Sequence, residues 1–144
     1  MIVLPDVNLL LALAWNNHRH HELAHDWLNN KQETEWATCL LTQSAFMRLS
    51  LNPQAVKFSI PASSAFEALN RIIAHPEHRF LANSPQLTEA PFAELVSRIA
   101  GYRQVPDATL LSMARMHDAK LVTFDRGAGG LCPWKEHVQV LEAS

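Results

Sequence analysis

The sequence has few of the features that mark secreted or membrane proteins. Its 144 residues include only two cysteines, Cys39 and Cys132, which lie far apart and lack the spacing of a metal site. This favours a reduced, cytosolic chain over a disulfide-rich secreted one. The amino terminus is apolar, but it carries Asp6 and Asn8 and has no basic leader. We therefore expect a cytoplasmic protein with no signal peptide and no membrane span.

A general excess of positive charge is also missing. The formal net charge is −2 at pH 7, so the chain lacks the basic surface typical of proteins that coat DNA. A nucleic-acid substrate is still compatible with this charge, because a bound metal ion can bind a phosphate group without a basic protein surface. The composition is that of an ordinary globular protein, with 48% hydrophobic residues. The length predicts one domain that spans residues 1–144.

Short apolar strands alternate with helical patterns along the whole chain. Strands are expected at 2–4, 35–41, 78–82, 121–124 and 137–141. Helices are expected at 7–15, 20–29, 43–51, 92–100 and 107–117, and one more follows 60–64 and ends near 74. This alternation favours an α/β fold with a mostly parallel sheet of four to five short strands. Thr42 is the expected N-cap of one helix, and Gly101 is the expected C-cap of another.

Three aspartates lie where strands and helices of this pattern meet. Asp6 follows the strand 2–4, Asp107 lies in the first turn of a helix, and Asp125 ends the strand 121–124. In an open parallel sheet, ligands bind beyond the carboxyl ends of the strands. Three carboxylates gathered there would repel one another, and a hard cation such as Mg²⁺ or Mn²⁺ would relieve the repulsion. The placement therefore predicts an acidic metal site.

Each aspartate also has a simpler explanation. Asp107 favours the helix dipole in any first turn, Asp6 can cap its helix, and Asp125 can open a turn. Their shared position at one end of the sheet is the reason to prefer a common site over three separate roles.

The histidine-rich segment 18–25 is a competing candidate. His21 and His25 are one helical turn apart, a spacing that can bind zinc, and HELAHD is faintly similar to the His-Asp pair of HD phosphohydrolases. Those domains are all-helical, whereas the strands here are well marked. We therefore expect these histidines to be solvated helix residues.

Other chemical candidates are weaker. The stretch RGAGG at 126–130 offers backbone N–H groups to a phosphate but has no P-loop ending, so a flexible turn beside the site is expected. Four arginines are candidates for phosphate contacts, although most arginines are plain surface residues: Arg48, Arg103, Arg115 and Arg126. The four tryptophans are expected in the core or at an interface rather than as platforms for base stacking: Trp15, Trp27, Trp36 and Trp134. The first three exceed what a small core needs, which favours a homodimer.

Four blocks of the chain form a longer pattern. They are PDVNLLLAL at 5–13, the histidine-rich helix ending in Trp27-Leu28, ATCLLTQSAFMRL at 37–49, and YRQVPDATLLSMARMHDAKLVTFD at 102–125. In these residues the chain resembles the PIN-domain family, specifically the VapC-type toxin ribonucleases of bacterial toxin–antitoxin pairs. The resemblance covers nearly the whole chain, and its last block is long and specific.

This resemblance implies a three-layer α/β/α fold, Mg²⁺-dependent endoribonuclease activity on RNA and a cognate VapB-type antitoxin. It implies that Asp6, Asp107 and Asp125 are the catalytic and metal-site residues of a type II toxin. Such toxins are commonly homodimers. Two other functions stay open: a metal-dependent nuclease with another nucleic-acid substrate, and a catalytically silent protein that only binds an antitoxin.

One position departs from the family pattern. PIN domains usually carry a glutamate in the helix after the second strand, but the helix 42–50 contains no acid, and Gln43 is the nearest polar substitute. A carboxamide adds no negative charge, so we expect one metal held chiefly by Asp6 and Asp107, with Asp125 acting through water. Alternatively, Gln43 only begins its helix and faces solvent. The auxiliary candidates for the site are Gln43, Asn8 and Arg126.

Overall fold

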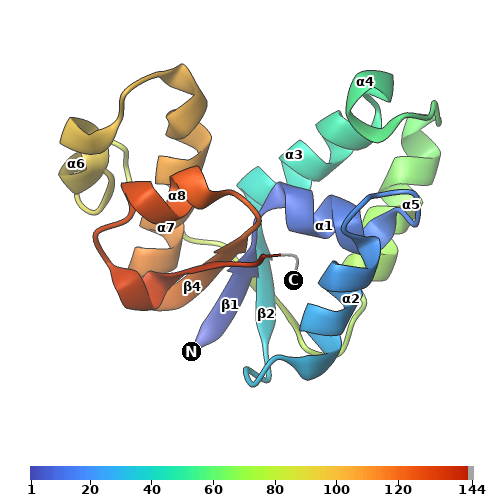
Figure 1. The fold of residues 1–144 in the computed structure, drawn as a ribbon, viewed down its shortest axis with the longest axis horizontal. Helices are drawn as coiled ribbons and strands as arrows, with labels where there is room; N and C mark the ends of the chain where they lie inside the picture. The colour runs from blue at the N-terminus through green and yellow to red at the C-terminus, as the bar shows by residue number, and fades with distance from the viewer. Residues whose placement is uncertain (143–144) are drawn as a thin grey trace.

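The first strand of the chain lies at the centre of the sheet (Figure 1). In the computed structural model, which describes residues 1–142, β1 (Ile2–Pro5) pairs with β4 (Ala119–Thr123) on one side and β2 (Trp36–Cys39) on the other. The edges are β3 (His78–Leu81) and β5 (Val138–Val140). The order is β3-β2-β1-β4-β5, and the pairings are parallel. The predicted parallel sheet of short strands is therefore confirmed.

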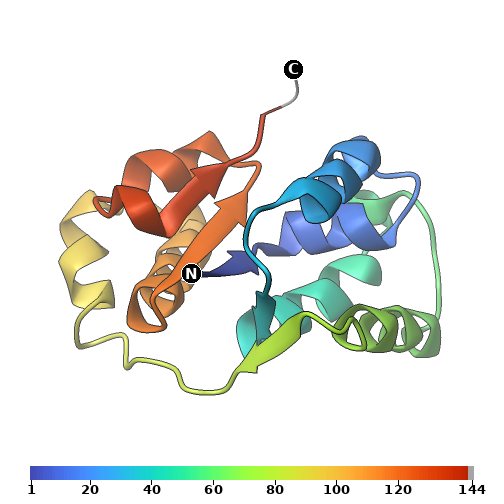
Figure 2. The same ribbon diagram turned by 90° about the horizontal axis from the view of Figure 1, so that it is seen from below.

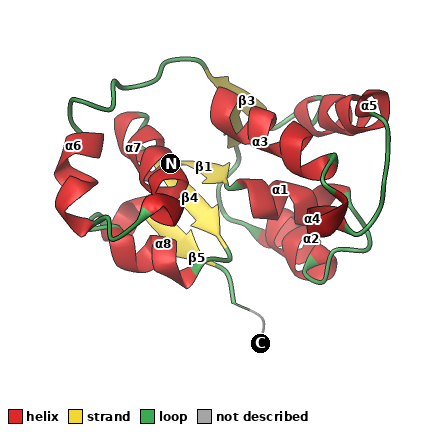
Figure 3. Cartoon of the chain, turned by 90° about the horizontal axis from the view of Figure 1, so that it is seen from above, coloured by secondary structure: helices red, strands yellow, loops and turns green. Residues whose placement is uncertain are grey.

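Helices cover both faces of this sheet (Figures 1 and 2). One face carries α1 (Val7–Ala14), α2 (His21–Asn30), α3 (Leu40–Ser50), α4 (Pro53–Val56) and α5 (Ala62–Ile73). The other carries α6 (Phe92–Leu95), α7 (Val105–Met116) and α8 (Arg126–Leu131). Short 3₁₀ turns lie at Val96–Arg98, Tyr102–Gln104 and Lys135–His137. The segment 82–91 crosses from β3 to α6 (Figure 3). None of the helices within residues 1–142 is long and apolar enough to cross a membrane.

Successive residues of the central strands point into two separate hydrophobic clusters. Val3 and Val122 pack in the cluster that contains α1, while Leu4 and Leu121 pack in the cluster that contains α7. All four side chains are fully buried. Helices cover both faces of the sheet, and this is why the sequences of the central strands are continuous apolar runs.

The tryptophans of the amino-terminal half belong to the core. Trp27 and Trp36 are 8% and 2% exposed, and the Trp15 ring stacks on Phe46. Trp15 Nε1 also donates a hydrogen bond to Ser50 Oγ at 3.0 Å. These rings fill the space between the sheet and its covering helices. Of the two places predicted for these rings, the structure shows the core, so they do not themselves support a homodimer.

The helix α3 begins earlier than the sequence pattern predicts. Cys39 is its N-cap, and Thr42 occupies the third helical position. The Thr42 hydroxyl accepts a hydrogen bond from the Cys39 backbone N–H at 3.0 Å, which is one half of a capping box. The predicted strand 35–41 is therefore too long at its carboxyl end, where β2 stops at Cys39. The predicted N-cap at Thr42 is wrong, because Thr42 caps the helix from its third position.

The predicted helix 92–100 is also replaced by shorter elements. Within α6 and the 3₁₀ turn Val96–Arg98, only Phe92 and Leu95 are buried. Most of the stability of a helix comes from packing of its apolar face, and buried residues in a single turn do not stabilise a longer α-helix. Gly101 is not its C-cap, since its φ of −166° is extended and it precedes the next 3₁₀ turn.

The glycine-rich stretch after β4 is helical rather than a flexible turn. Asp125 is the N-cap of α8, and its Oδ1 accepts a hydrogen bond from the Gly127 backbone N–H at 2.7 Å. Ala128 and Leu131, one turn apart, are buried and anchor the helix to the core. The predicted flexible turn is wrong, because the N-cap and the buried residues stabilise the helix. Their contribution exceeds the destabilisation by glycine, which is about 1 kcal/mol per residue in a helix.

Candidate acidic metal centre

Asp6, Asp107 and Asp125 meet at the carboxyl-terminal edge of the sheet. Asp6 joins β1 to α1, Asp125 joins β4 to α8, and Asp107 lies in the first turn of α7. Pro5 lies opposite Val122 in the β1–β4 ladder, so the aspartates that follow these strands come close together. The charge of Asp125 acts on both other carboxyl groups, and the charge of Asp6 acts on Asp107. The fold thus brings the three predicted residues within reach of one another.

Asp6 is the most buried of the three, with 5% of its surface exposed. Its Oδ1 accepts a hydrogen bond from the Leu9 backbone N–H at 2.9 Å, and its Oδ2 accepts one from the Thr123 hydroxyl. Burial raises the pKa of Asp6 above its usual value, although these two hydrogen bonds act in the opposite direction. The carboxylate therefore caps α1 and also contributes negative charge to the site.

Asp107 and Asp125 form a pair. Burial, the charge of Asp125, a hydrogen bond between the two side chains and the charge of Asp6 together raise the pKa of Asp107 to about 6. When Asp107 holds a proton, its carboxyl group donates that hydrogen bond to the Asp125 carboxylate. When it is ionised, three negative groups face one another with only solvent to screen them.

Thr123 is a site residue that the sequence interpretation missed. It is fully buried, and its hydroxyl donates to Asp6 Oδ2 while its oxygen accepts a hydrogen bond from the Asp125 backbone N–H at 3.0 Å. One side chain therefore positions two of the acids. The available signal was a hydroxyl residue inside an apolar strand, because a buried polar group requires a partner.

Gln43 does not face solvent. Its Nε2 donates a hydrogen bond to Thr38 Oγ1 at 3.0 Å, and Thr38 Oγ1 lies 2.7 Å from His78 Nε2. This chain of contacts ties the start of α3 to β2 and β3. Within residues 1–142 no hydrogen bond joins Gln43 to the three aspartates. The solvent-facing alternative is wrong, while a role for Gln43 toward a metal stays a prediction.

The other auxiliary candidates lie at the surface. Asn8 is exposed in the first turn of α1. Arg126 pairs with Glu142 instead of the aspartates, with Nε 3.2 Å from Oε1. In the described part of the chain, neither side chain forms a hydrogen bond with Asp6, Asp107 or Asp125.

The histidines of α2 hold two helices together. His21 Nδ1 lies 2.7 Å from the Ala12 carbonyl oxygen, and His25 Nε2 lies 2.9 Å from that of Leu13. The last carbonyls of a helix lack partners within it, and here the imidazoles supply them. The expectation of solvated side chains is wrong for His21 and His25, because one nitrogen of each ring contacts a carbonyl oxygen of α1.

Residues 3–129 match the sequence profile of the PIN domain. The chain belongs to the PIN domain family. Ribonuclease VapC38 of Mycobacterium tuberculosis (strain ATCC 25618 / H37Rv) is 42% identical over 126 residues, which cover 88% of this chain and 86% of that protein. Ribonuclease VapC44 of the same strain is 35% identical over 126 residues, covering 88% and 87%. Ribonuclease VapC29 of that strain is 34% identical over 131 residues, covering 91% of each. The resemblance drawn from the sequence is confirmed.

The acidic site of this PIN domain suits a hard cation in its chemistry. Its charged donors are all carboxylate oxygens, the ligands that Mg²⁺ and Mn²⁺ prefer, and positive charge would relieve their repulsion. In the observed side-chain conformations, residues 1–142 contain no group of three His, Cys, Asp or Glu side chains that could coordinate one metal ion. Oxygens of Asp6 and of Asp125 already accept hydrogen bonds, but each carboxylate oxygen has a second lone pair, so these contacts leave both side chains able to ligate an ion.

Proposed function

We propose that this PIN domain is a metal-dependent endoribonuclease and the toxin of a type II toxin–antitoxin pair. The observation that carries the proposal is the group formed by Asp6, Asp107 and Asp125 at the carboxyl-terminal edge of the sheet, where their charges act on one another. The similarity to Ribonucleases VapC38, VapC44 and VapC29 supports RNA as the substrate.

Mg²⁺ is the proposed cofactor, and Mn²⁺ is expected to replace it. When bound, such an ion lowers the pKa of a water molecule and neutralises charge that develops on the attacked phosphate. We propose that Asp6 and Asp107 would hold it chiefly and that Asp125 would act through water, as expected from the sequence, since Mg²⁺ usually keeps several waters. Asp125 Oδ1 already accepts a hydrogen bond from the Gly127 backbone N–H, and the Asp125 side chain is hydrogen-bonded to Asp107.

The chain's own residues have distinct parts in this proposal. Asp107 is half-buried beside Asp125 and is the proposed acceptor of the proton that leaves the attacking water. Asp6 supplies fixed negative charge at the base of the site. Thr123 keeps Asp6 and the backbone of Asp125 in place. In-line displacement at phosphorus then breaks the phosphodiester bond.

A VapB-type antitoxin and a second copy of this chain are the proposed protein partners. Tyr102 and Leu40 are 79% and 71% exposed, and they lie at the starts of the segments leading into α7 and α3, at the same end of the sheet as the acids. An antitoxin segment that covered such apolar residues could place an arginine against the aspartates and block them. The dimer would be tested by light scattering at tens of micromolar protein, where a strict monomer contradicts it.

The deciding experiment measures RNA cleavage with Mg²⁺ and with a chelator. Asp6→Asn, Asp107→Asn and Asp125→Asn each remove a negative charge while keeping the side chain's shape, so each should reduce cleavage by orders of magnitude. Asp26→Asn, at an exposed position on α2, is the matched control and should leave the rate unchanged.

Three outcomes would contradict this function. If two of the three variants cleave at the parental rate, the site lies elsewhere in the chain. Cleavage of DNA with RNA left intact would indicate a nuclease of another specificity. Antitoxin binding without any cleavage would indicate a silent member of the family.

A further inference from the structure

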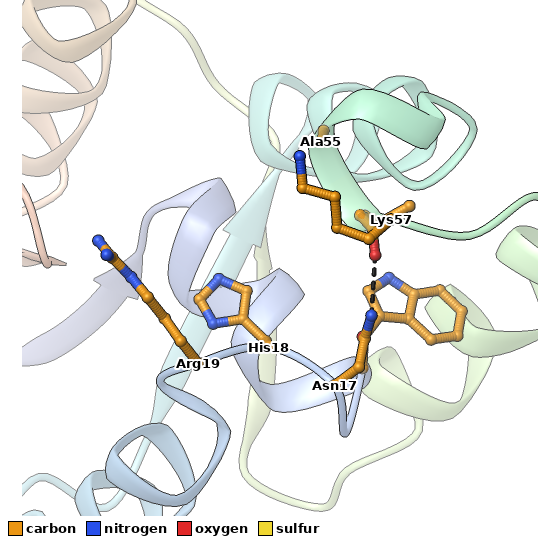
Figure 4. Close-up of a pocket in the computed structure, with 7 residues that line it drawn as sticks. Asn17, His18, Arg19, Ala55 and Lys57 are labelled. Carbon is orange, nitrogen blue, oxygen red and sulfur yellow. Dashed lines mark hydrogen bonds between the residues drawn. The ribbon is translucent and has the colours of Figure 1, made fainter.

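A cavity of about 290 Å³ lies between the α1–α2 connection and α4 (Figure 4). We call it the basic pocket, and it is lined by Trp15, Asn17, His18, Arg19, Ala55, Val56 and Lys57. Its charged lining consists of two cations and no carboxylate, in a chain whose net charge is −2. Among the ion pairs of residues 1–142, none involves Arg19 or Lys57. The basic pocket is therefore suited to an anion.

The walls of the basic pocket are held by hydrogen bonds. Asn17 Nδ2 donates to the Val56 carbonyl oxygen at 2.9 Å, the contact drawn in Figure 4, which joins the α1–α2 connection to α4. Lys57 Nζ donates to the Gln54 carbonyl oxygen at 2.8 Å, which holds the ammonium group at the rim. A pocket fixed in this way loses little freedom when it binds a ligand.

Lys57 occupies a backbone conformation that does not favour lysine. It is the C-cap of α4 with φ of 67°, in the left-handed region where glycine is the least strained residue. Its side chain is exposed, and the hydrogen bond from Nζ to the Gln54 carbonyl oxygen helps to cap α4. Glycine would adopt this backbone conformation without strain, so the lysine adds both this cap and a positive charge at the rim of the basic pocket.

Aromatic rings connect the basic pocket to the acidic centre. Phe124 lies between Thr123 and Asp125 at the end of β4. Its ring centroid is 4.7 Å from that of His20 and 6.3 Å from that of His18, whose ring is nearly parallel to it. His18 in turn lines the basic pocket. The contacts of these rings thus run from the residue that precedes Asp125 in the sequence to His18, which lines the basic pocket together with Arg19 and Lys57.

His18 is arranged as a hydrogen-bond donor toward the basic pocket. Its Nδ1 accepts a hydrogen bond from the His20 backbone N–H at 3.0 Å, so the neutral ring carries its proton on Nε2. Burial and the neighbouring positive charges of His20 and Arg19 lower the pKa of His18, which favours this neutral form. The lining of the basic pocket therefore includes three side chains of a kind that donates hydrogen bonds to phosphate, with the Arg19 and Lys57 head groups on different sides of it (Figure 4).

We propose that the basic pocket binds a backbone phosphate of single-stranded RNA, on one side of the bond that is cleaved at the aspartates. The base of the nucleotide between this phosphate and the cleaved bond then stacks on the rings of His20 and Phe124. Bases of a single strand are free to stack on aromatic side chains, whereas those of a duplex are not. This inference rests on the proposed ribonuclease function and adds the path of the substrate across the surface.

The test measures binding without cleavage. Full-length protein in a chelator is titrated against a fluorescently labelled single-stranded RNA of mixed sequence, and anisotropy is followed from 50 to 200 mM salt. Arg19→Ala and Lys57→Ala should each weaken binding several-fold and reduce the slope of log K against log salt by about 0.7, the value for one lost phosphate contact on a single strand. His20→Ala should weaken binding and leave the slope unchanged, because it removes a ring and not a phosphate contact.

Matched controls separate charge in the basic pocket from charge elsewhere. Arg98→Ala and Lys135→Ala remove exposed cations near α6 and before β5, on the other face of the sheet, and should change neither affinity nor slope. Lys57→Gly relieves the left-handed backbone. It should melt no lower than the parent protein while losing as much RNA affinity as Lys57→Ala, a combination that a structural role for Lys57 does not produce.

Failure of this inference is distinguishable from failure of the ribonuclease function. If the parent binds and cleaves RNA but the variants of Arg19 and Lys57 keep its affinity and slope, the basic pocket is not a phosphate site and the ribonuclease proposal stands. If the parent neither binds nor cleaves RNA, both proposals fall. Variants that keep RNA affinity but lose binding to an acidic peptide such as polyglutamate would assign the basic pocket to a protein partner and overturn the inference.

Discussion

The Thr123 hydroxyl donates a hydrogen bond to Asp6 across 117 residues of sequence. The same oxygen accepts the backbone N–H of Asp125, so one buried side chain sets the position of an acid from β1 and an acid from β4. A threonine in the core of a strand is thereby part of the acidic centre, although it carries no charge.

Thr123→Val tests this relationship, because it removes the hydroxyl and keeps the branched shape. Asp6 then loses a donor and the Asp125 N–H loses its acceptor, so the free energy of unfolding should fall by about 1–3 kcal/mol. RNA cleavage should fall further than this loss of stability explains, since Asp6 is no longer held. Urea unfolding and cleavage rates measured on the same preparation give both numbers. Thr123→Ser keeps the hydroxyl and should retain cleavage, and a parental rate in Thr123→Val would show that the hydroxyl does not position Asp6.

The raised pKa of Asp107 predicts how the stability of the metal-free protein depends on pH. Because the folded state holds this proton more tightly than the unfolded state, the contribution is fully present below the ordinary value of 3.8 and is lost as the pH rises through about 6. Asp107→Asn removes the repulsion, so it should melt above the parent at pH 7, and the difference should shrink toward pH 4. Melting curves in a chelator between pH 4 and 8 measure it.

Added metal supplies the complementary measurement for Asp107. Mg²⁺ at pH 7 should raise the melting temperature of the parent and should raise that of Asp107→Asn much less, because a ligand has been lost. Asp26→Asn should follow the parent throughout. A parent protein that gains stability over Asp107→Asn as the pH rises from 4 to 7 in chelator would contradict the pairing of Asp107 with Asp125.

Gln43→Glu should change the titration of His78. With Gln43 Nε2 donating to Thr38, the Thr38 hydroxyl hydrogen is free to point at His78 Nε2. Burial, aided by the charge of His75, lowers the pKa of His78. A glutamate would accept the Thr38 hydroxyl instead, His78 Nε2 would become the donor, and the pKa of His78 should rise. An NMR titration of His78 measures the change, and Gln43→Leu, which adds no charge, is the control.

The same substitution tests the metal role of Gln43. If the missing acid limits the site, Gln43→Glu should bind Mn²⁺ more tightly than the parent in isothermal titration and should need less Mg²⁺ for half-maximal cleavage. Identical affinity and stoichiometry would leave Gln43 with its structural contact to Thr38 alone.

His21 is predicted to contribute stability rather than zinc binding. His21→Ala leaves the Ala12 carbonyl at the end of α1 without its partner and should lower the free energy of unfolding by about 1 kcal/mol. Glu22→Ala, at the neighbouring exposed position, should have a smaller effect. Added Zn²⁺ should not change the melting temperature of the parent. A rise with Zn²⁺ that His21→Ala abolishes would assign these histidines to a metal site.

The two strand ends that carry Asp6 and Asp125 were predictable from sequence. Their apolar runs are continuous and end in an aspartate, and the rule for parallel sheets places such residues at one edge. The boundaries were less predictable, because Thr42 closes its cap from the third helical position and Asp125 starts a helix despite the glycines. A hydroxyl in an apolar strand indicates that Thr123 needs a partner, but nothing near it in the sequence identifies that partner as Asp6. The role of Gln43 depends on how the first turn of α3 packs back on Thr38 of β2.

The central place of β1 has a consequence for synthesis of the chain. Asp6 is made by the ribosome 117 residues before Thr123, so the contact between them can form only after all of that intervening segment has been added. Closing so long a segment is among the slowest contacts for a chain to form, and domains acquire such contacts late. Nascent chains are therefore expected to carry no assembled acidic centre. Any cleavage of RNA by this protein would begin only after Asp125 has been made and has folded against Asp6.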